Sequence, residues 1–139
     1  MKKFEILSFP KFSDSRGDLF PFELDEKFPF PVRRVYLATS RDDHTRGGHA
    51  HKIESEVFVA ASGSITARVN DGGGSTDQEI VLDSPQKALL VRRGCWHEFS
   101  NFAPGSVLLA FSSTHYLPGD ENYIRDRAEF LKLSGDGQI

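Results

Sequence analysis

The sequence has a single cysteine and no long apolar run. Because Cys95 is the only cysteine among 139 residues, an intrachain disulfide and a zinc site built from cysteines are both excluded. No apolar stretch approaches the roughly 20 residues that a membrane helix needs. Lys2 and Lys3 are followed by a mixed segment, 4–12, that contains Glu, Ser, Pro and Lys instead of the apolar core of a signal peptide. We therefore expect no membrane role and a cytoplasmic location.

The sequence also lacks a basic block or stripe. It carries 17 Lys and Arg against 20 Asp and Glu, for a net charge of −3. Proteins that follow a nucleic-acid backbone concentrate positive charge on one surface. Nucleic acid is therefore not the expected partner, and any phosphate would be recognised by a few local side chains.

Short runs rich in Val, Ile, Phe and Tyr recur along the chain between turn residues. Glycines in 62–64 and 71–74 supply the positive φ that tight hairpin turns require. This spacing predicts an antiparallel β-sandwich or barrel, in one domain spanning residues 1–139. The predicted strands are 18–24, 32–38, 56–61, 64–70, 78–82, 88–91, 97–102 and 106–112.

The two ends of the chain differ in character. Residues 1–12 begin with a strand-like run and predict an N-terminal strand. Residues 120–133 are rich in charge, and one face of a helix there would carry Tyr123, Arg127, Phe130 and Leu131. A short C-terminal helix over 120–133 is therefore predicted to close one side of the barrel.

Two motifs carry the chemistry-bearing residues. In His49-Ala50-His51, alternate positions of a strand would place both imidazoles on one face. Glu56 and Gly63 complete the pattern His-x-His, four residues, Glu, six residues, Gly, and the segment 94–101 follows as Gly-x-x-His-x-x-x-Asn. The paired motifs resemble those of the cupin superfamily. The resemblance implies an all-β, RmlC-like jelly-roll barrel.

Longer segments resemble the sugar 3,4-ketoisomerases, which are the FdtA- and QdtA-type, WxcM-like cupins. The resemblance covers nearly the whole chain in register. It implies an isomerase that moves the keto group of a dTDP-4-keto-6-deoxyhexose from C4 to C3, for 3-amino-deoxysugar biosynthesis, without a metal or organic cofactor. The matching segments are Asp14-Ser15-Arg16-Gly17, Arg33-Arg34-Val35-Tyr36, Arg46-Gly47-Gly48-His49-Ala50-His51-Lys52, Leu82-Asp83-Ser84-Pro85, Trp96-His97-Glu98 and Tyr123-Ile124-Arg125.

The isomerisation needs a base and an acid that face the same two carbons. An imidazole suits this exchange because it titrates close to neutral pH. By similarity, His49 is expected to be the base at C3, and His51 to orient the sugar or relay the proton. Tyr36 is expected to donate a hydrogen bond to the oxyanion of the enediolate.

Five further residues are expected to bind substrate. Guanidinium groups match the geometry of phosphate, so Arg16 and Arg46 would hold the pyrophosphate or nearby hydroxyls. Trp96, His97 and Glu98 complete this set. The pair of Arg16 with His97 resembles the branch of the family whose product has the galacto configuration at C4, and it favours that product. The family is also dimeric, which implies a homodimer that exchanges its N-terminal strands, with Arg16 in its own site or the partner's.

Glu56 departs from the family pattern, in which glutamine is usual at this place. A metal-binding cupin has glutamate there. A divalent transition metal held by His49, His51, Glu56 and His97 is therefore a second hypothesis, for an isomerase, a dioxygenase or a sensor. Without metal, the carboxylate would raise the pKa of a neighbouring imidazole and fix its tautomer. A non-catalytic module that binds a sugar nucleotide is a third hypothesis, and a 3,5-epimerase is a fourth.

Overall fold

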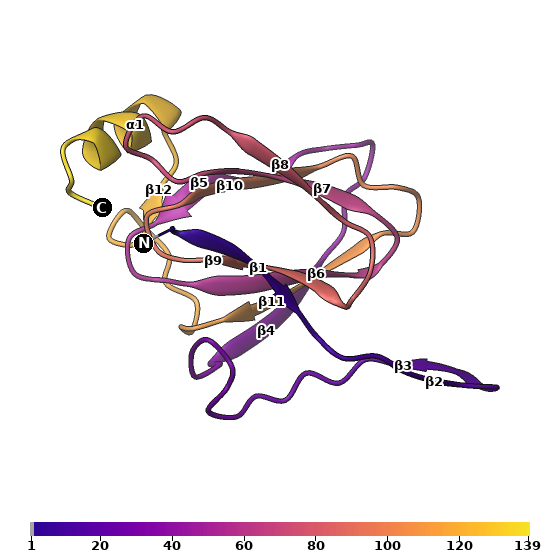
Figure 1. Cartoon of the computed structure of the whole chain (residues 1–139). Helices are drawn as coiled ribbons and strands as arrows, with labels where there is room; N and C mark the ends of the chain where they lie inside the picture. The colour runs from indigo at the N-terminus through magenta and orange to yellow at the C-terminus, as the bar shows by residue number, and fades with distance from the viewer. Residues whose placement is uncertain (1) are drawn as a thin grey trace.

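The computed structural model describes residues 2–139. Two five-stranded antiparallel sheets face each other and enclose the core of a jelly-roll barrel, and one helix lies at an end of it (Figure 1). The first sheet has the order β1-β9-β6-β11-β4 and the second β12-β5-β10-β7-β8. The elements are β1 (Phe4–Ser8), β2 (Phe12–Asp14), β3 (Gly17–Leu19), β4 (Arg34–Ala38), β5 (Arg46–His51), β6 (Glu56–Ser62), β7 (Ile65–Asn70), β8 (Gln78–Leu82), β9 (Lys87–Val91), β10 (Trp96–Ser100), β11 (Val107–Ser112), β12 (Tyr123–Ile124) and α1 (Arg127–Gly135).

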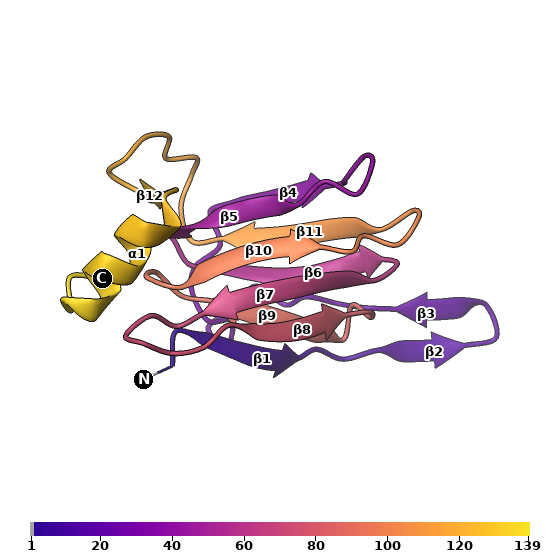
Figure 2. The same cartoon turned by 90° about the horizontal axis from the view of Figure 1, so that it is seen from above.

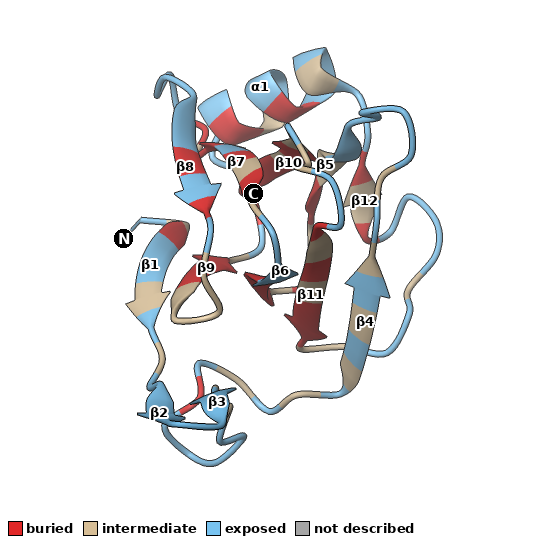
Figure 3. Ribbon diagram, turned by 90° about the vertical axis from the view of Figure 1, so that its right-hand side faces the viewer, coloured by how far each residue is buried: buried red, intermediate tan, exposed pale blue. Residues whose placement is uncertain are grey.

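The barrel interior is filled by the inward-facing side chains of both sheets. Buried residues lie on strands of both sheets (Figure 3). Phe58 of β6 and Phe99 of β10 meet across it, with their ring centroids 4.6 Å apart. Strict alternation of inward and outward residues is clear in β7, where Ile65, Ala67 and Val69 are fully buried. Within the described residues 2–139, no helix has the length and apolar character that crossing a membrane requires.

The outer face of the first sheet is covered by the segment between β3 and β4. Phe22, Phe28 and Phe30 of this segment pack on Val57, Val59, Leu90 and Phe111. Strands β6, β9 and β11 are therefore buried on both faces, which explains their nearly continuous apolar sequences. It also explains why so many of the 12 phenylalanines lie outside the barrel interior.

The C-terminal helix covers part of the outer face of the second sheet. The predicted helix over 120–133 begins too early, because Tyr123 and Ile124 pair with β5 as strand β12. The helix starts only after Asp126, whose carboxylate accepts hydrogen bonds from the backbone of Ala128 and Glu129 as an N-cap. Phe130 then packs on Trp96 and is fully buried.

Two further expectations about local structure are wrong. Residues 18–24 are not one strand, since β3 ends at Leu19 and pairs only with β2 in a hairpin that extends away from the barrel (Figure 2). The N-terminal strand predicted over 1–12 ends at Ser8, and residue 1 lies outside the described residues.

The connection at 62–64 is also different from the expected hairpin turn, because β6 and β7 belong to different sheets. Gly63 adopts a φ of 76° there, and a Cβ at this position would lie 2.1 Å from Ser106 Oγ. Only glycine fits this close crossing between the sheets. The 71–74 glycines do lie in a hairpin connection, between β7 and β8.

Candidate active site

A pocket of about 430 Å³ opens between the two sheets. This volume is within the range usual for small-molecule sites. Strands β4, β5, β6, β10 and β12 all contribute side chains to it. The lining residues are Arg34, Tyr36, Ala38, Thr45, Arg46, Gly47, His49, His51, Glu56, Phe58, His97, Phe99, Leu108 and Tyr123.

Three imidazoles meet in this pocket. His49 and His51 lie on one face of β5, as expected, with their ring centroids 4.7 Å apart. His97 of β10 is the cross-strand partner of His49 and lies 4.8 Å from it and 5.2 Å from His51. His49 is only partly buried, whereas the other two rings are buried. It is therefore the imidazole most accessible from the pocket.

The imidazoles are held in the neutral form. Burial, and then the charge that His97 would carry, lowers the pKa of His49 to about 3. Burial also lowers the pKa of His97 to about 4. The pKa of His51 is lowered by burial and by the other two imidazoles. At neutral pH each ring therefore has an unprotonated nitrogen that can accept a proton.

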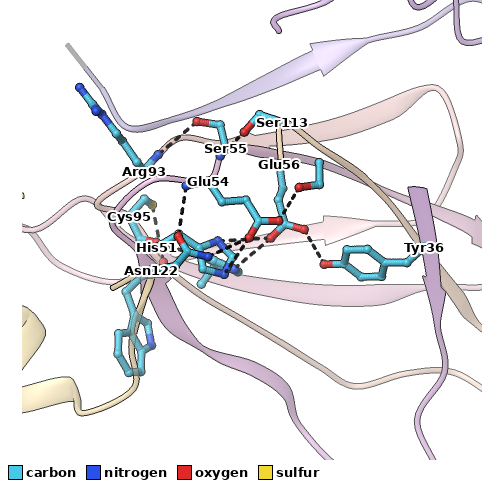
Figure 4. A network of polar contacts seen from close by, with 12 residues as sticks. Tyr36, His51, Glu54, Ser55, Glu56, Arg93, Cys95, Ser113 and Asn122 are labelled. Carbon is cyan, nitrogen blue, oxygen red and sulfur yellow. Dashed lines mark hydrogen bonds and ion pairs between the residues drawn. The ribbon is translucent and has the colours of Figure 1, made fainter. Parts of the chain in front are cut away.

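Tyr36 of β4 and Glu56 of β6 both line the pocket and contact each other. Tyr36 Oη donates to Glu56 Oε2 at 2.6 Å. The other oxygen, Glu56 Oε1, lies 3.5 Å from His51 Nδ1 and 3.9 Å from His97 Nε2 (Figure 4 shows Tyr36, His51 and Glu56). Burial and the nearby carboxylate of Glu56 raise the pKa of Tyr36 far above its usual value. Tyr36 therefore keeps its proton at neutral pH.

Glu56 holds a proton at neutral pH as well. His97 Nδ1 lies 3.1 Å from the carbonyl oxygen of Cys95, which can only accept, so Nδ1 carries the proton and Nε2 is an acceptor. An ionised Glu56 would then face the lone pair of Nε2. Burial, followed by the charge of Glu54, raises the pKa of Glu56 to about 8. The protonated carboxyl accepts from Tyr36 and can donate to an imidazole, which is the donor and acceptor pattern of a glutamine side chain.

Tyr123 was not predicted as a site residue, although it lies in a segment that matches the ketoisomerases. Its ring packs edge-on against His49 at 5.0 Å and His51 at 4.8 Å. The guanidinium of Arg125 lies 4.1 Å from the centre of the same ring. The sequence pattern did not indicate that Tyr123 lies in the pocket, because 120–133 has the charge content of a surface helix. Only the pairing of β12 with β5 brings Tyr123 to the pocket.

Not all of the expected substrate-binding residues reach the pocket. Arg46 lines it. Trp96 and Glu98 do not, because they flank the inward-facing His97 on β10 and so point to the outer face. Trp96 packs on Phe130 beneath the helix, and Glu98 forms an ion pair with Arg68. We therefore leave Trp96 and Glu98 out of the site.

Arg16 also lies away from this pocket. It is at the tip of the β2–β3 hairpin, where its Nη2 contacts Asp14 Oδ2 at 2.6 Å and its side chain is 89% exposed. Hydrogen bonding to Arg16 holds the pKa of the Asp14 carboxyl below its usual value. Within one chain, Arg16 has no contact with the three imidazoles.

The same residues are suited in type to a transition metal. One nitrogen from each of His49, His51 and His97 lies within 4.8 Å of the others, and Glu56 Oε1 is adjacent. Three imidazoles and one carboxylate are common ligands for Fe, Mn, Ni and Zn. Such a metal would have to displace the proton that Glu56 holds.

Comparisons with known proteins agree on one family. The family described as "FdtA: WxcM-like, C-terminal" matches residues 2–135. A TDP-4-oxo-6-deoxy-alpha-D-glucose-3,4-oxoisomerase from Aneurinibacillus thermoaerophilus is 36% identical over 129 residues, which are 92% of this chain and 90% of the relative.

Solved structures give the same result. A 3,4-ketoisomerase from Helicobacter canadensis has a TM-score of 0.85 at 33% identity, with 96% of this chain and 98% of that chain covered. QdtA from Thermoanaerobacterium thermosaccharolyticum, a sugar 3,4-ketoisomerase solved with TDP, has a TM-score of 0.87 at 30% identity, with coverage of 99% and 98%. An rmlC epimerase from Mycobacterium tuberculosis, 24% identical with a TM-score of 0.72 over 84% of this chain and 66% of that chain, shares the fold alone.

The expected RmlC-like cupin fold is thus confirmed, and so is the family. The match extends over nearly the whole chain and includes the strands that carry the imidazoles. This chain belongs to the WxcM-like, FdtA-type family of sugar 3,4-ketoisomerases.

Proposed function

We propose that this protein is an isomerase that converts TDP-4-keto-6-deoxyglucose into its 3-keto isomer. The observation that carries the proposal is the placement of His49, an accessible neutral imidazole, in one pocket with Tyr36, a phenol that keeps its proton. His49 and Tyr36 thus provide a base and a hydrogen-bond donor that line the same pocket. The relatives from Aneurinibacillus and Thermoanaerobacterium act on, or are solved with, the corresponding TDP-sugar.

In the proposed reaction His49 removes the proton from C3 of the sugar. The electrons of the C3–H bond form the double bond of an enediolate between C3 and C4, and the C4 carbonyl oxygen becomes an oxyanion. Tyr36 donates a hydrogen bond to this oxyanion. A proton then returns to C4, and the proton of the C3 hydroxyl is transferred to the oxyanion on C4, so that a ketone forms at C3 and a hydroxyl at C4. The sugar gains and loses no electrons overall, so no redox cofactor is required.

His51 is proposed to orient the sugar or relay the proton. Both of its ring nitrogens lie near glutamate oxygens, Nδ1 at 3.5 Å from Glu56 and Nε2 at 3.7 Å from Glu54. This ring is 3% exposed and less available to substrate than His49. Access to the pocket therefore supports the proposal, made from similarity, that His49 is the base.

Arg46, which lines the pocket, is proposed to bind the pyrophosphate. Arg16 is proposed to act in a homodimer, where a hairpin extended from one copy would bring it to the partner's site. Phe12 and Leu19 oppose each other on this hairpin and are 63% and 60% exposed. Such an apolar pair is suited to burial against a second copy. In the single chain β1 pairs with β9, so exchange of the N-terminal strand stays a prediction.

We further propose the galacto configuration at C4 for the product. The support is the presence of His97 in the pocket wall beside His49, together with Arg16 on the hairpin. The stereochemistry depends on the face of the enediolate that receives the proton, and both side chains would border that face in a dimer. The use of the product in 3-amino-deoxysugar biosynthesis and the cytoplasmic location stay predictions.

The test uses protein stripped of metal by a chelator and incubated with TDP-4-keto-6-deoxyglucose in heavy water. NMR of the sugar protons should show exchange at C3, movement of the ketone to C3 and a C4 coupling pattern of the galacto type. A gluco coupling pattern would contradict only the stereochemical assignment. No exchange with stripped protein, and activity on adding Fe, Mn, Ni or Zn, would establish a metal-dependent reaction.

A metal-dependent enzyme is the second candidate function, favoured by the spacing of the three imidazole nitrogens within 4.8 Å. The residues that would hold the metal are His49, His51, Glu56 and His97. A bound cation would polarise a substrate oxygen. A binding module without catalysis is the third possibility, and binding of TDP without any exchange at C3 under either condition would support it.

A further inference from the structure

Glu54 is a buried charged residue for which the proposed reaction has no use. It lies in the turn between β5 and β6 and is 1% exposed. Its carboxylate faces three donors, which are Arg34 Nη2 at 3.0 Å, Ser112 Oγ at 2.5 Å and Asn122 Nδ2 at 3.1 Å. Burying a carboxylate is costly unless donors and a counter-ion surround it. This site therefore holds Glu54 as an acceptor in a fixed position.

One ring nitrogen of His51 points to Glu54. His51 Nε2 is buried and has no hydrogen-bond partner within residues 2–139, and it lies 3.7 Å from Glu54 Oε1. Figure 4 shows the His51 ring beside the carboxyl groups of Glu54 and Glu56. A proton on Nε2 is attracted by the Glu54 carboxylate, whereas a lone pair there is repelled. Glu54 thus favours the tautomer with its proton on Nε2 and leaves Nδ1 as an acceptor toward Glu56.

A second link runs through Asn122. Its side-chain oxygen accepts from the backbone of Ile53 and Glu54 at 3.2 and 3.3 Å, and its amide donates to Glu54. The backbone of Lys52 donates to the Asn122 carbonyl at 2.6 Å. Because Tyr123 is the next residue, these bonds fix the strand that carries its ring to His49 and His51.

A third link runs through Arg34. Its guanidinium, held by Glu54 Oε2, lies 5.1 Å from the ring centre of Tyr36. Glu54 itself does not line the pocket. It contacts residues from β5, β11 and β4, and it reaches β12 through Asn122. A change at Glu54 would therefore act on the orientation of groups that touch the substrate, and not on the substrate directly.

We propose that Glu54 is a positioning residue of this enzyme, which holds His51 in the tautomer protonated on Nε2 and fixes Tyr36 and Tyr123 through Arg34 and Asn122. The effect on catalysis rests on the proposed function, whereas the tautomer does not. A mutation remote from the chemistry that misplaces a reacting group by about 1 Å can lower the rate by about 10²-fold. Binding of the nucleotide would change little, because Glu54 has no contact with the pocket.

The test compares Glu54→Gln with the wild-type protein. Glutamine keeps the shape of the side chain, removes the charge and presents an amide NH₂ to groups that are themselves donors. We expect kcat to fall by roughly 10- to 100-fold with KM changed less than about threefold. In protein labelled with ¹⁵N-histidine, the wild type should show His51 protonated on Nε2, and Glu54→Gln should show a mixture of tautomers. A His51→Gln variant assigns the signals.

Glu5→Gln is the matched control. Glu5 also pairs with an arginine, Arg92, at 3.1 Å, but on β1 and outside the pocket. It should leave both kcat and the His51 signals unchanged. A wild-type protein in which His51 carries its proton on Nδ1 would overturn the proposal, even if Glu54→Gln does not fold. A Glu54→Gln enzyme with the kcat and the His51 tautomer of the wild type would also overturn it. A wild-type protein without isomerase activity would defeat the proposed function alone, since the tautomer measurement needs no turnover.

Discussion

The phenol of Tyr36 donates a 2.6 Å hydrogen bond to Oε2 of Glu56, and Oε1 of the same carboxyl faces His51 and His97. Tyr36 is therefore oriented by a group that it shares with two of the three imidazoles. Because the carboxyl retains its proton at neutral pH, it can serve the same purpose as the glutamine that is usual in the family. The glutamate is then compatible with a metal-free site.

Glu56→Gln is expected to retain activity at pH 7 within about threefold, because glutamine has the same donor and acceptor pattern as the protonated carboxyl. The pKa of Glu56 is about 8, above its ordinary value of 4.5, so ionisation begins as pH rises toward 8. Wild-type kcat should therefore fall above about pH 8, and the variant should lose this decline. If Glu56→Gln is inactive at pH 7 and a change of pH does not restore its activity, this result would indicate that Glu56 is a metal ligand instead.

His49→Ala is expected to lose turnover by roughly 10²- to 10⁴-fold, the usual contribution of a positioned base. Binding of TDP, measured by calorimetry, should be largely retained, because the base acts on the sugar. His115→Ala is the control, since His115 is exposed and outside the pocket. Equal loss of turnover and TDP binding would show that His49 is needed to build the site.

Tyr36→Phe removes the donor to the oxyanion and should lower kcat by roughly 10²- to 10³-fold. It also leaves Glu56 Oε2 without its partner, which should cost about 1 kcal/mol of unfolding free energy. Single-turnover kinetics and urea titration measure the two effects separately. Tyr116→Phe is the matched control, because Tyr116 is 59% exposed. A kcat that falls no more than in the control would remove Tyr36 from the mechanism.

The buried histidines should make the protein sensitive to acid. The pKa of His97 is lowered from 6.5 to about 4, so the unfolded chain binds a proton in this window and the folded chain does not. Stability is therefore complete above pH 6.5 and is lost as pH falls toward 4. Between pH 6.5 and 5 the loss from one such histidine is about 2 kcal/mol.

Glu56 contributes in the opposite direction, since its raised pKa stabilises the fold at low pH and this contribution is lost as pH rises from 4.5 to about 8. Urea unfolding of wild type, His97→Gln and Glu56→Gln at pH 5, 6.5 and 8 separates the two contributions. His97→Gln should reduce the acid loss, and Glu56→Gln should steepen the net rise in stability with pH. A wild-type stability that is constant from pH 8 to 5, with both variants also constant, would contradict both assignments.

The sequence by itself determined the fold, the family and the pair of histidines. Period-two alternation is a local property, so His49 and His51 had to share a face once the segment was a strand. The same alternation along β10 places Trp96 and Glu98 opposite His97, and applying it there would have kept both residues out of the predicted site. The motifs around Glu56 and Gly63 indicated the barrel through their resemblance to the cupin superfamily.

Only the tertiary structure decided which other groups meet these histidines. Tyr123 reaches them because β12 pairs with β5, a strand far away in the chain, and a charged segment gives no local sign of that pairing. Glu54 and Arg34 meet through burial between strands, and Glu56 holds a proton because of the buried surroundings of its carboxyl. Proton affinity and cross-strand contacts depend on the surrounding packing, and residue types and spacing alone do not specify them.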